Sequence, residues 1–137
     1  MSEPAAPFRR VQFLDEAASD VRALAARSRP ILVEVFRLLK LLDRGQLQPV
    51  PLRDFGKTGD LSDCGKIVVA LDGEPEYRIV VRGSGSSIDV VDVVAVEDRT
   101  HDLPYILAGL RLERISDPVR RSDAQRRIDR IRSLREG

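Results

Sequence analysis

The run VEDRTHDLPY, residues 96–105, places an arginine, a histidine and a tyrosine close together at the end of an apolar segment. Arg99 carries a permanent charge, the imidazole of His101 is a common acid–base group in proteins, and the phenol of Tyr105 can donate or accept a hydrogen bond. A turn between a strand and a helix needs a cap, but it does not need these three side chains. The stretch is therefore either an ordinary solvated corner or a site that holds a negatively charged group.

Further cations stand at corresponding places in neighbouring segments. Lys66 opens one predicted strand, Arg78 lies near the start of the next, and Arg99 follows the third. In an antiparallel meander these three points can converge on one side of the sheet. A helix that begins near Thr100 would add free N–H groups, which favour an anion. Three cations, a helix N-terminus and the phenol of Tyr105 suit a phosphate group.

Three β-branched runs must position these side chains: GKIVVALD, EYRIVVR and SIDVVDVVAVE. The connectors DGEP and GSGS are short and turn-like, so the runs predict an antiparallel meander. The last run is apolar almost throughout, which is typical of a central strand covered on both faces. In the middle run, Arg78 and Arg82 are expected to share a face.

Helical patterns flank the meander. FRRVQFL predicts a short first strand, Asp15 an N-cap, and Pro30 the first turn of a second helix that ends at Gly45. Residues 46–63 predict a loop rich in proline, glycine and aspartate. A helix capped by Thr100 or Asp102 follows the meander. The sequence thus predicts an α+β domain: an N-terminal strand and a helical hairpin packed on a twisted, mainly antiparallel sheet of about four strands, with C-terminal helices.

The arginine-rich segment 116–137 closes the chain with a narrow apolar stripe, Ala124, Ile128, Ile131 and Leu134. Three interpretations stay open. The stripe packs on the sheet, which is the usual arrangement for such a helix, or the segment contacts ribosomal RNA, or it is an interaction helix.

Composition limits the possible functions. The chain has 137 residues and a net charge of only +1, so nucleic-acid binding would need a local basic patch. A single cysteine, Cys64, excludes an internal disulfide, and with one histidine a zinc site of the usual ligands is not expected. We expect no cofactor and no metal.

The N-terminus lacks the apolar core of a signal peptide, and no segment approaches the length of a membrane span. We therefore expect a cytoplasmic protein.

The order of these elements and three motifs resemble the RelE/ParE toxin superfamily of bacterial toxin–antitoxin systems. The motifs are GDLSDCGKIVV, EYRIVVR and DVVAVEDRTHDLPYILAGLRL. They contain the set Gly59, Asp60, Leu61, Lys66, Tyr77, Arg78, Arg99 and Tyr105. Each motif is weak alone, and together, in this order and at these spacings, they are moderately specific. The resemblance covers residues 8–115 and implies a RelE-like domain there. Residues 1–7, rich in proline and alanine without periodicity, predict a flexible tail, and the arginine-rich segment 116–137 is a helical extension beyond the length of typical members.

What the resemblance implies is a ribosome-dependent mRNA endonuclease that works without a metal by attack of a 2′-hydroxyl on the adjacent phosphate. It also implies a cognate antitoxin protein, the ribosome and mRNA as partners. Arg78 and Arg99 would grip the scissile phosphate, and Lys66 would stabilise charge or transfer a proton. Tyr105, acidified by nearby cations, would be the base or would stack on a nucleobase.

His101 and Glu97 are alternative acid–base groups, and Arg82 and Lys57 are expected to contact RNA nearby. Two departures point another way. A second lysine often follows two residues after the Lys66 position in the nuclease branch, and here that residue is Val68. Strong ribosome binders are also more basic than this chain. The alternative is a non-catalytic member, ParE-like or of phage or orphan type, that acts by binding gyrase or another protein.

Overall fold

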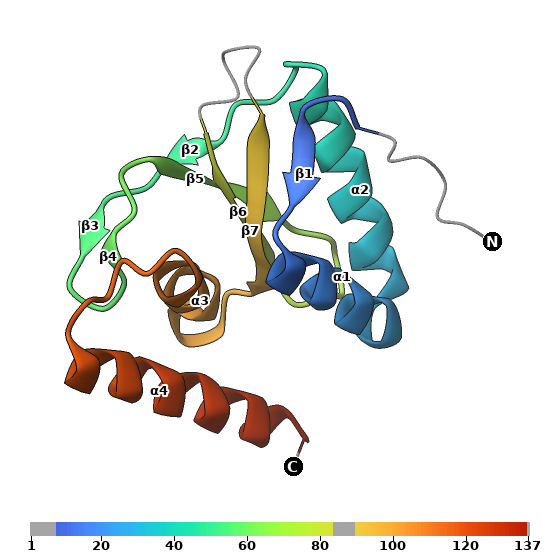
Figure 1. The fold of residues 1–137 in the computed structure, drawn as a ribbon. Helices are drawn as coiled ribbons and strands as arrows, with labels where there is room; N and C mark the ends of the chain where they lie inside the picture. The colour runs from blue at the N-terminus through green and yellow to red at the C-terminus, as the bar shows by residue number, and fades with distance from the viewer. Residues whose placement is uncertain (1–7, 84–89, 137) are drawn as a thin grey trace.

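The computed structural model describes residues 8–83 and 90–136 (Figure 1). The expected tail at residues 1–7 and most of the expected GSGS turn lie outside the described residues. The helices are α1 (Asp15–Arg27), α2 (Arg29–Asp43), α3 (Leu103–Arg111) and α4 (Pro118–Glu136), with a short 3₁₀ helix η1 (Thr100–Asp102) before α3. The strands are β1 (Val11–Phe13), β2 (Val50–Pro51), β3 (Asp54–Phe55), β4 (Gly59–Asp60), β5 (Cys64–Val69), β6 (Tyr77–Arg82) and β7 (Val91–Asp98).

The main sheet has the order β1-β7-β6-β5-β2. Strands β5, β6 and β7 form the predicted antiparallel meander, and β1 runs parallel to β7 at the sheet edge. The predicted α+β class is confirmed. The sheet has five strands rather than about four, because Val50 and Pro51 pair with Lys66 and Gly65 at the opposite edge. An edge strand tolerates the proline, since the missing N–H faces away from the sheet.

Helices cover both faces of this sheet (Figure 1). On one face α1 and α2 pack on a core that contains Ile79 and Val81; on the other, α3 packs on a core that contains Val80 and Val94. The alternation along β6 is that of a strand buried on both sides. Because β7 lies between β1 and β6 and helices cover both faces, its side chains are buried almost throughout, as its apolar sequence predicts.

The expected N-cap at Asp15 is wrong by one residue. Leu14 precedes α1 without a capping side chain, and Asp15 is the first helical residue, where its charge favours the helix dipole. Ser28 instead caps α2 by accepting a hydrogen bond from the Ile31 N–H at 3.3 Å. This cap and Pro30 separate the two helices of the predicted hairpin.

Helix α4 forms as the periodicity predicts, but it packs on α3. Ala124, Ile128 and Ile131 are buried in the core beneath α3. Leu134 is 70% exposed, so its place in the buried stripe is wrong. Near that end of α4, the contacts with the rest of the chain are made by arginines such as Arg135, which pairs with Glu97. Within the described residues, no helix is both long enough and apolar enough to cross a membrane.

The end of α2 is tied to β1 through one carboxylate. Asp43 accepts hydrogen bonds from the backbone N–H groups of Arg9, Arg10 and Val11 at 2.7–3.1 Å. Burial raises the pKa of Asp43, but these N–H groups outweigh burial and leave the pKa below its ordinary value. The ionised carboxylate therefore stabilises the fold.

We expect Asp43→Ala to lower the free energy of unfolding by about 1–3 kcal/mol at pH 7, since hydrogen bonds to a charged group are lost. A carboxyl with a depressed folded pKa contributes its stability above its unfolded pKa, about 3.9, and loses it as the pH falls through the lower folded pKa. Urea unfolding at pH 7 and near pH 2 measures both effects. The exposed Asp72→Ala is the control. A deficit that persists unchanged at the lower pH would contradict a role for the charge.

Candidate functional site

The phenol of Tyr105, on α3, lies beside the guanidinium of Arg78, near the start of β6. Arg78 Nη1 donates a hydrogen bond to the Tyr105 hydroxyl at 3.3 Å. The Arg78 side chain is only 12% exposed, and its Nε has no hydrogen-bond acceptor among the described residues. A buried arginine with an unused donor is an electrostatic feature suited to binding an anion.

Tyr105 also lines a pocket of about 450 Å³, together with Leu52, Gly56, Lys57, Thr58, Lys66 and Asp102. Lys66 enters it from β5, where it is the third residue of the strand rather than the first. Lys57 lies at the turn between β3 and β4, and its Nζ is 3.6 Å from the Asp102 carboxylate. The pocket thus brings two lysines and the Arg78–Tyr105 pair into one neighbourhood, as the sequence predicts for Lys66, Arg78 and Tyr105.

Two glycines fix the β3–β4 hairpin beside α3, and with it Lys57. A Cβ at Gly109 would lie 2.1 Å from the carbonyl oxygen of Thr58, so α3 touches the hairpin backbone directly. Gly59 has φ +78°, and a Cβ there would lie 2.2 Å from the carbonyl oxygen of Arg114. Any other residue at either position would push the hairpin away.

A carboxylate that the sequence analysis missed joins the two arginines. Glu76 pairs with Arg78 by a short contact, and its Oε2 lies 3.9 Å from Nη1 of Arg99. The Arg99 side chain is 62% exposed and contacts this carboxylate, while the Arg99 backbone N–H donates to the Glu76 carbonyl oxygen at 3.0 Å. Glu76 stands two residues before Arg78, and residues two apart in extended chain point the same way. That spacing is the signal that could have identified it.

The expected acidification of Tyr105 is wrong. Burial raises the pKa of the Tyr105 phenol, and the lowering effect of Arg78 does not compensate. The phenol is therefore protonated at neutral pH, and it serves as a hydrogen-bond or proton donor rather than as a ready base.

Three of the predicted residues lie away from the pocket: His101, Arg82 and Glu97. His101 is exposed in η1 with φ 51°, and it does not line the pocket. Arg82 lies at the opposite end of β6 from Arg78, about 13 Å along the strand at the usual rise per residue. There its guanidinium pairs with Asp92 at 2.7 Å. Val68, at the position of the missing second lysine, pairs with Arg78 across the β5–β6 register and is exposed.

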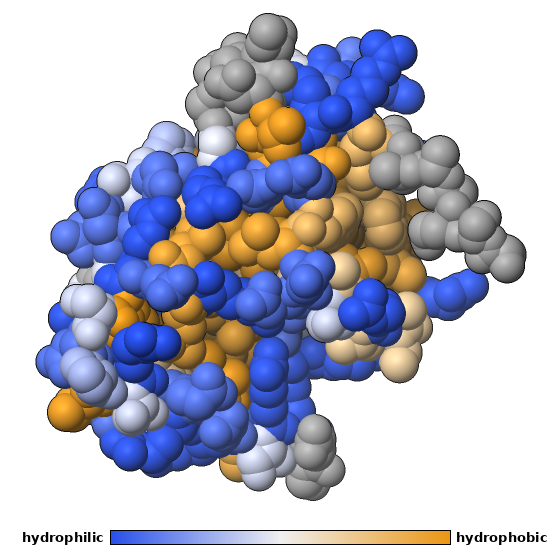
Figure 2. Space-filling view, in the orientation of Figure 1, coloured by the Kyte–Doolittle hydropathy of each residue, from blue (hydrophilic) through white to orange (hydrophobic). Residues whose placement is uncertain are grey.

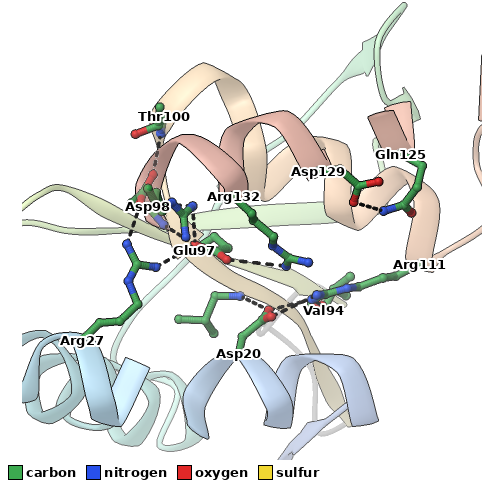
Figure 3. Close-up of polar contacts among 12 residues, drawn as sticks. Asp20, Arg27, Val94, Glu97, Asp98, Thr100, Arg111, Gln125, Asp129 and Arg132 are labelled. Atoms are coloured by element: carbon green, nitrogen blue, oxygen red, sulfur yellow. Dashed lines mark hydrogen bonds and ion pairs between the residues drawn. The ribbon is translucent and has the colours of Figure 1, made fainter. Parts of the chain in front are cut away.

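Glu97 is held in a structural ion cluster instead of the pocket (Figure 3). Its buried carboxylate lies 3.0 Å from Arg135, 3.5 Å from Arg27 and 3.7 Å from Arg132. Asp98 shares Arg27 and Arg135 at 3.2 Å each. These contacts join β7 to α1 and α4, so Glu97 acts in the fold and we do not assign it to catalysis.

Across the part of the chain that the structure describes, no three His, Cys, Asp or Glu side chains are grouped to hold a metal ion. The candidate site consists of Lys57, Lys66, Arg78 and Tyr105 around the pocket, with Glu76 and Arg99 beside it. No protein-family model matches the sequence, and neither a curated protein nor a solved structure matches the chain.

Proposed function

We propose that the protein is a RelE-like toxin that cleaves mRNA on the ribosome by metal-free attack of a 2′-hydroxyl. The observation that carries this proposal is the buried Arg78 guanidinium bonded to the Tyr105 hydroxyl, beside a pocket that Tyr105 and Lys66 both line. The proposal includes a cognate antitoxin protein as partner and the cytoplasm as location.

In the proposed reaction the 2′-oxygen bonds to phosphorus and the bond from phosphorus to the 5′-oxygen breaks. The products are a 2′,3′-cyclic phosphate and a free 5′-hydroxyl. The transition state carries more negative charge on the phosphoryl oxygens than the substrate does, so Arg78 and Lys66 stabilise it preferentially. The protonated phenol of Tyr105 is suited to donate to the departing 5′-oxygen.

Glu76 holds Arg78 and Arg99 in the free protein, where a phosphate would compete for the same donors. Substrate binding therefore requires the Glu76 side chain to turn away from the two arginines. This side chain is 31% exposed, so its carboxylate can turn toward solvent. Once displaced, Glu76 is a carboxylate close to the reacting groups and able to accept the 2′-hydroxyl proton.

Mapping of mRNA 5′ ends in a cell-free translation reaction, with and without ribosomes, tests the proposal. We expect new 5′ ends inside translated codons, only when ribosomes are present, and none with Lys66→Ala. Intact mRNA in every reaction would refute the nuclease function.

We expect Tyr105→Phe to lower the single-turnover cleavage rate by about 10²-fold or more, the contribution of a positioned acid. The substitution keeps the ring that packs on the core, so stability should change little. Because the raised pKa keeps the phenol protonated below about pH 10, ionisation of Tyr105 should not alter the wild-type rate between pH 7 and 9. If Tyr105→Phe cleaved at the wild-type rate, the Tyr105 hydroxyl would not be the proton donor, and the side chain would serve in packing alone.

A second candidate is a non-catalytic member that binds gyrase or another protein. The occupation of both arginines by Glu76 favours it, since the phosphate donors are already paired. Arrested growth with intact mRNA and normal translation, together with capture of a protein partner, would support this alternative.

A further inference from the structure

A second, smaller pocket lies between the β3–β4 hairpin, α3 and α4. Its volume is about 180 Å³, and it is lined by Gly56, Lys57, Ile106, Arg120, Asp123, Ala124 and Arg127. Gly56 and Lys57 also line the larger pocket that contains Lys66 and Tyr105. The two pockets are therefore neighbours, one beside Lys66 and Tyr105 and the other beside the N-terminal half of α4.

Of the three cations that line the smaller pocket, Lys57 is within 3.6 Å of the exposed Asp102 carboxylate, whereas the two arginines have no such partner among the described residues. The guanidinium groups of Arg120 and Arg127 make no ion pair or hydrogen bond with any part of the chain that the structure describes. Asp123 is already paired with Arg126. The arginines near the other end of α4 differ, because Arg132 and Arg135 are engaged by Glu97 and Asp98 (Figure 3).

The geometry of α4 places the two free arginines along one line. Residues seven apart lie on the same face of a helix, about 10 Å apart along its axis. This line borders the buried stripe of Ala124 and Ile128. In the space-filling view, hydrophobic residues show between hydrophilic ones over α3 and α4 (Figure 2). The apolar lining of the smaller pocket, Ile106 and Ala124, suits a ribose or the face of a base.

We propose that Arg120, Arg127 and Lys57 form a phosphate-binding subsite that holds single-stranded RNA beyond the scissile phosphate. This inference rests on the proposed function, because it names the substrate path of the same site. Arginine binds phosphate oxygens through paired N–H groups, and the smaller pocket shares Gly56 and Lys57 with the larger one, so a strand bound in the larger pocket lies next to these arginines. The subsite gives the arginine-rich helix a role besides packing.

The test is the binding of a fluorescent, fully 2′-O-methylated oligoribonucleotide, which lacks the attacking hydroxyl and stays intact. Fluorescence anisotropy across a range of salt concentrations yields the slope of log K against log salt, about −0.7 per phosphate contact for single strands. We expect Arg120→Ala/Arg127→Ala to make this slope shallower by about 1.4 and to weaken binding. The control, Arg121→Ala/Arg130→Ala, removes the same charge from exposed positions that do not line the pocket, and it should keep the wild-type slope.

Each outcome decides one point. Equal losses in the test and control variants, with cleavage intact in wild type, would overturn the subsite and leave the nuclease function standing. A selective loss in Arg120→Ala/Arg127→Ala without any mRNA cleavage would keep the subsite and overturn the nuclease. No RNA binding by the wild-type chain, with polyglutamate binding that depends on Arg120 and Arg127, would overturn the RNA assignment in favour of an acidic protein segment. Circular dichroism spectra of the variants, compared with that of the wild type, test whether each variant is folded.

Discussion

Replacing Arg78 with alanine is expected to lower the rate of mRNA cleavage by about 10²- to 10³-fold, the usual cost of removing one preorganised donor to a developing negative charge. The guanidinium is mostly buried and already aligned by Tyr105, so it does not have to reorganise during the reaction. The loss should fall on the rate constant for cleavage rather than on ribosome binding, since the donor acts most strongly in the transition state.

Arg82→Ala is the matched control for this variant. It removes an arginine from the same strand, but from the opposite end, where the guanidinium pairs with Asp92. We expect its cleavage rate to stay near that of the wild type. Single-turnover cleavage on ribosomes stalled on a defined mRNA measures both variants, and thermal melting shows whether each is folded. Full cleavage by a folded Arg78→Ala protein would remove Arg78 from the mechanism.

Asp20→Ala is expected to lower the free energy of unfolding by about 3–5 kcal/mol, because it leaves a buried arginine without its counter-ion. Asp20, on α1, makes two contacts with the guanidinium of Arg111 on α3, at 2.6 and 3.0 Å (Figure 3). The same carboxylate accepts the Val96 N–H at 2.9 Å, and Arg111 donates to the Val94 carbonyl at 2.9 Å. One ion pair thus joins helices from the two sides of the sheet through β7.

Urea unfolding measures this loss, and the melting temperature should fall by on the order of 10 °C for a chain of this size. Adding Arg111→Met to Asp20→Ala should recover part of the stability, because the unpaired charge is then removed. The control is Asp123→Ala, which breaks an exposed pair with Arg126 and should cost less than about 1 kcal/mol. If Asp20→Ala lowered the free energy of unfolding no more than the control does, the buried pair would not be a stabilising link.

Much of the fold could be predicted from local patterns. The three long β-branched runs became β5, β6 and β7, and the helical hairpin and the arginine-rich helix formed near their expected bounds. Periodicity of 2 or 3.6 residues is a property of consecutive residues, so the sequence displays it directly. Strands β2, β3 and β4 were missed, because two residues are too few to show a period.

The candidate site was also predicted only in part from the sequence. The positions of Lys66, Arg78 and Tyr105 follow from strand order and helix start, and the structure brings them around one pocket. The partners of Glu97 do not follow from any spacing, because Arg27 and Arg135 reach it from distant segments. The sequence also predicted a lowered pKa for the Tyr105 phenol, whereas burial raises that pKa. Spacing along the chain does not show burial, because burial depends on contacts between distant segments.

The sequence by itself determined the longer helices and strands of this protein, their order, and the types of side chain available for chemistry. Only the tertiary structure decided which charges are neutralised and which are free. Glu76 pairs with Arg78, Glu97 pairs with Arg132 and Arg135, and the side chains of Arg120 and Arg127 have no partner among the described residues. The physical reason is that local patterns depend on neighbours in the chain, whereas charge pairing and desolvation depend on distances between segments that only folding brings together.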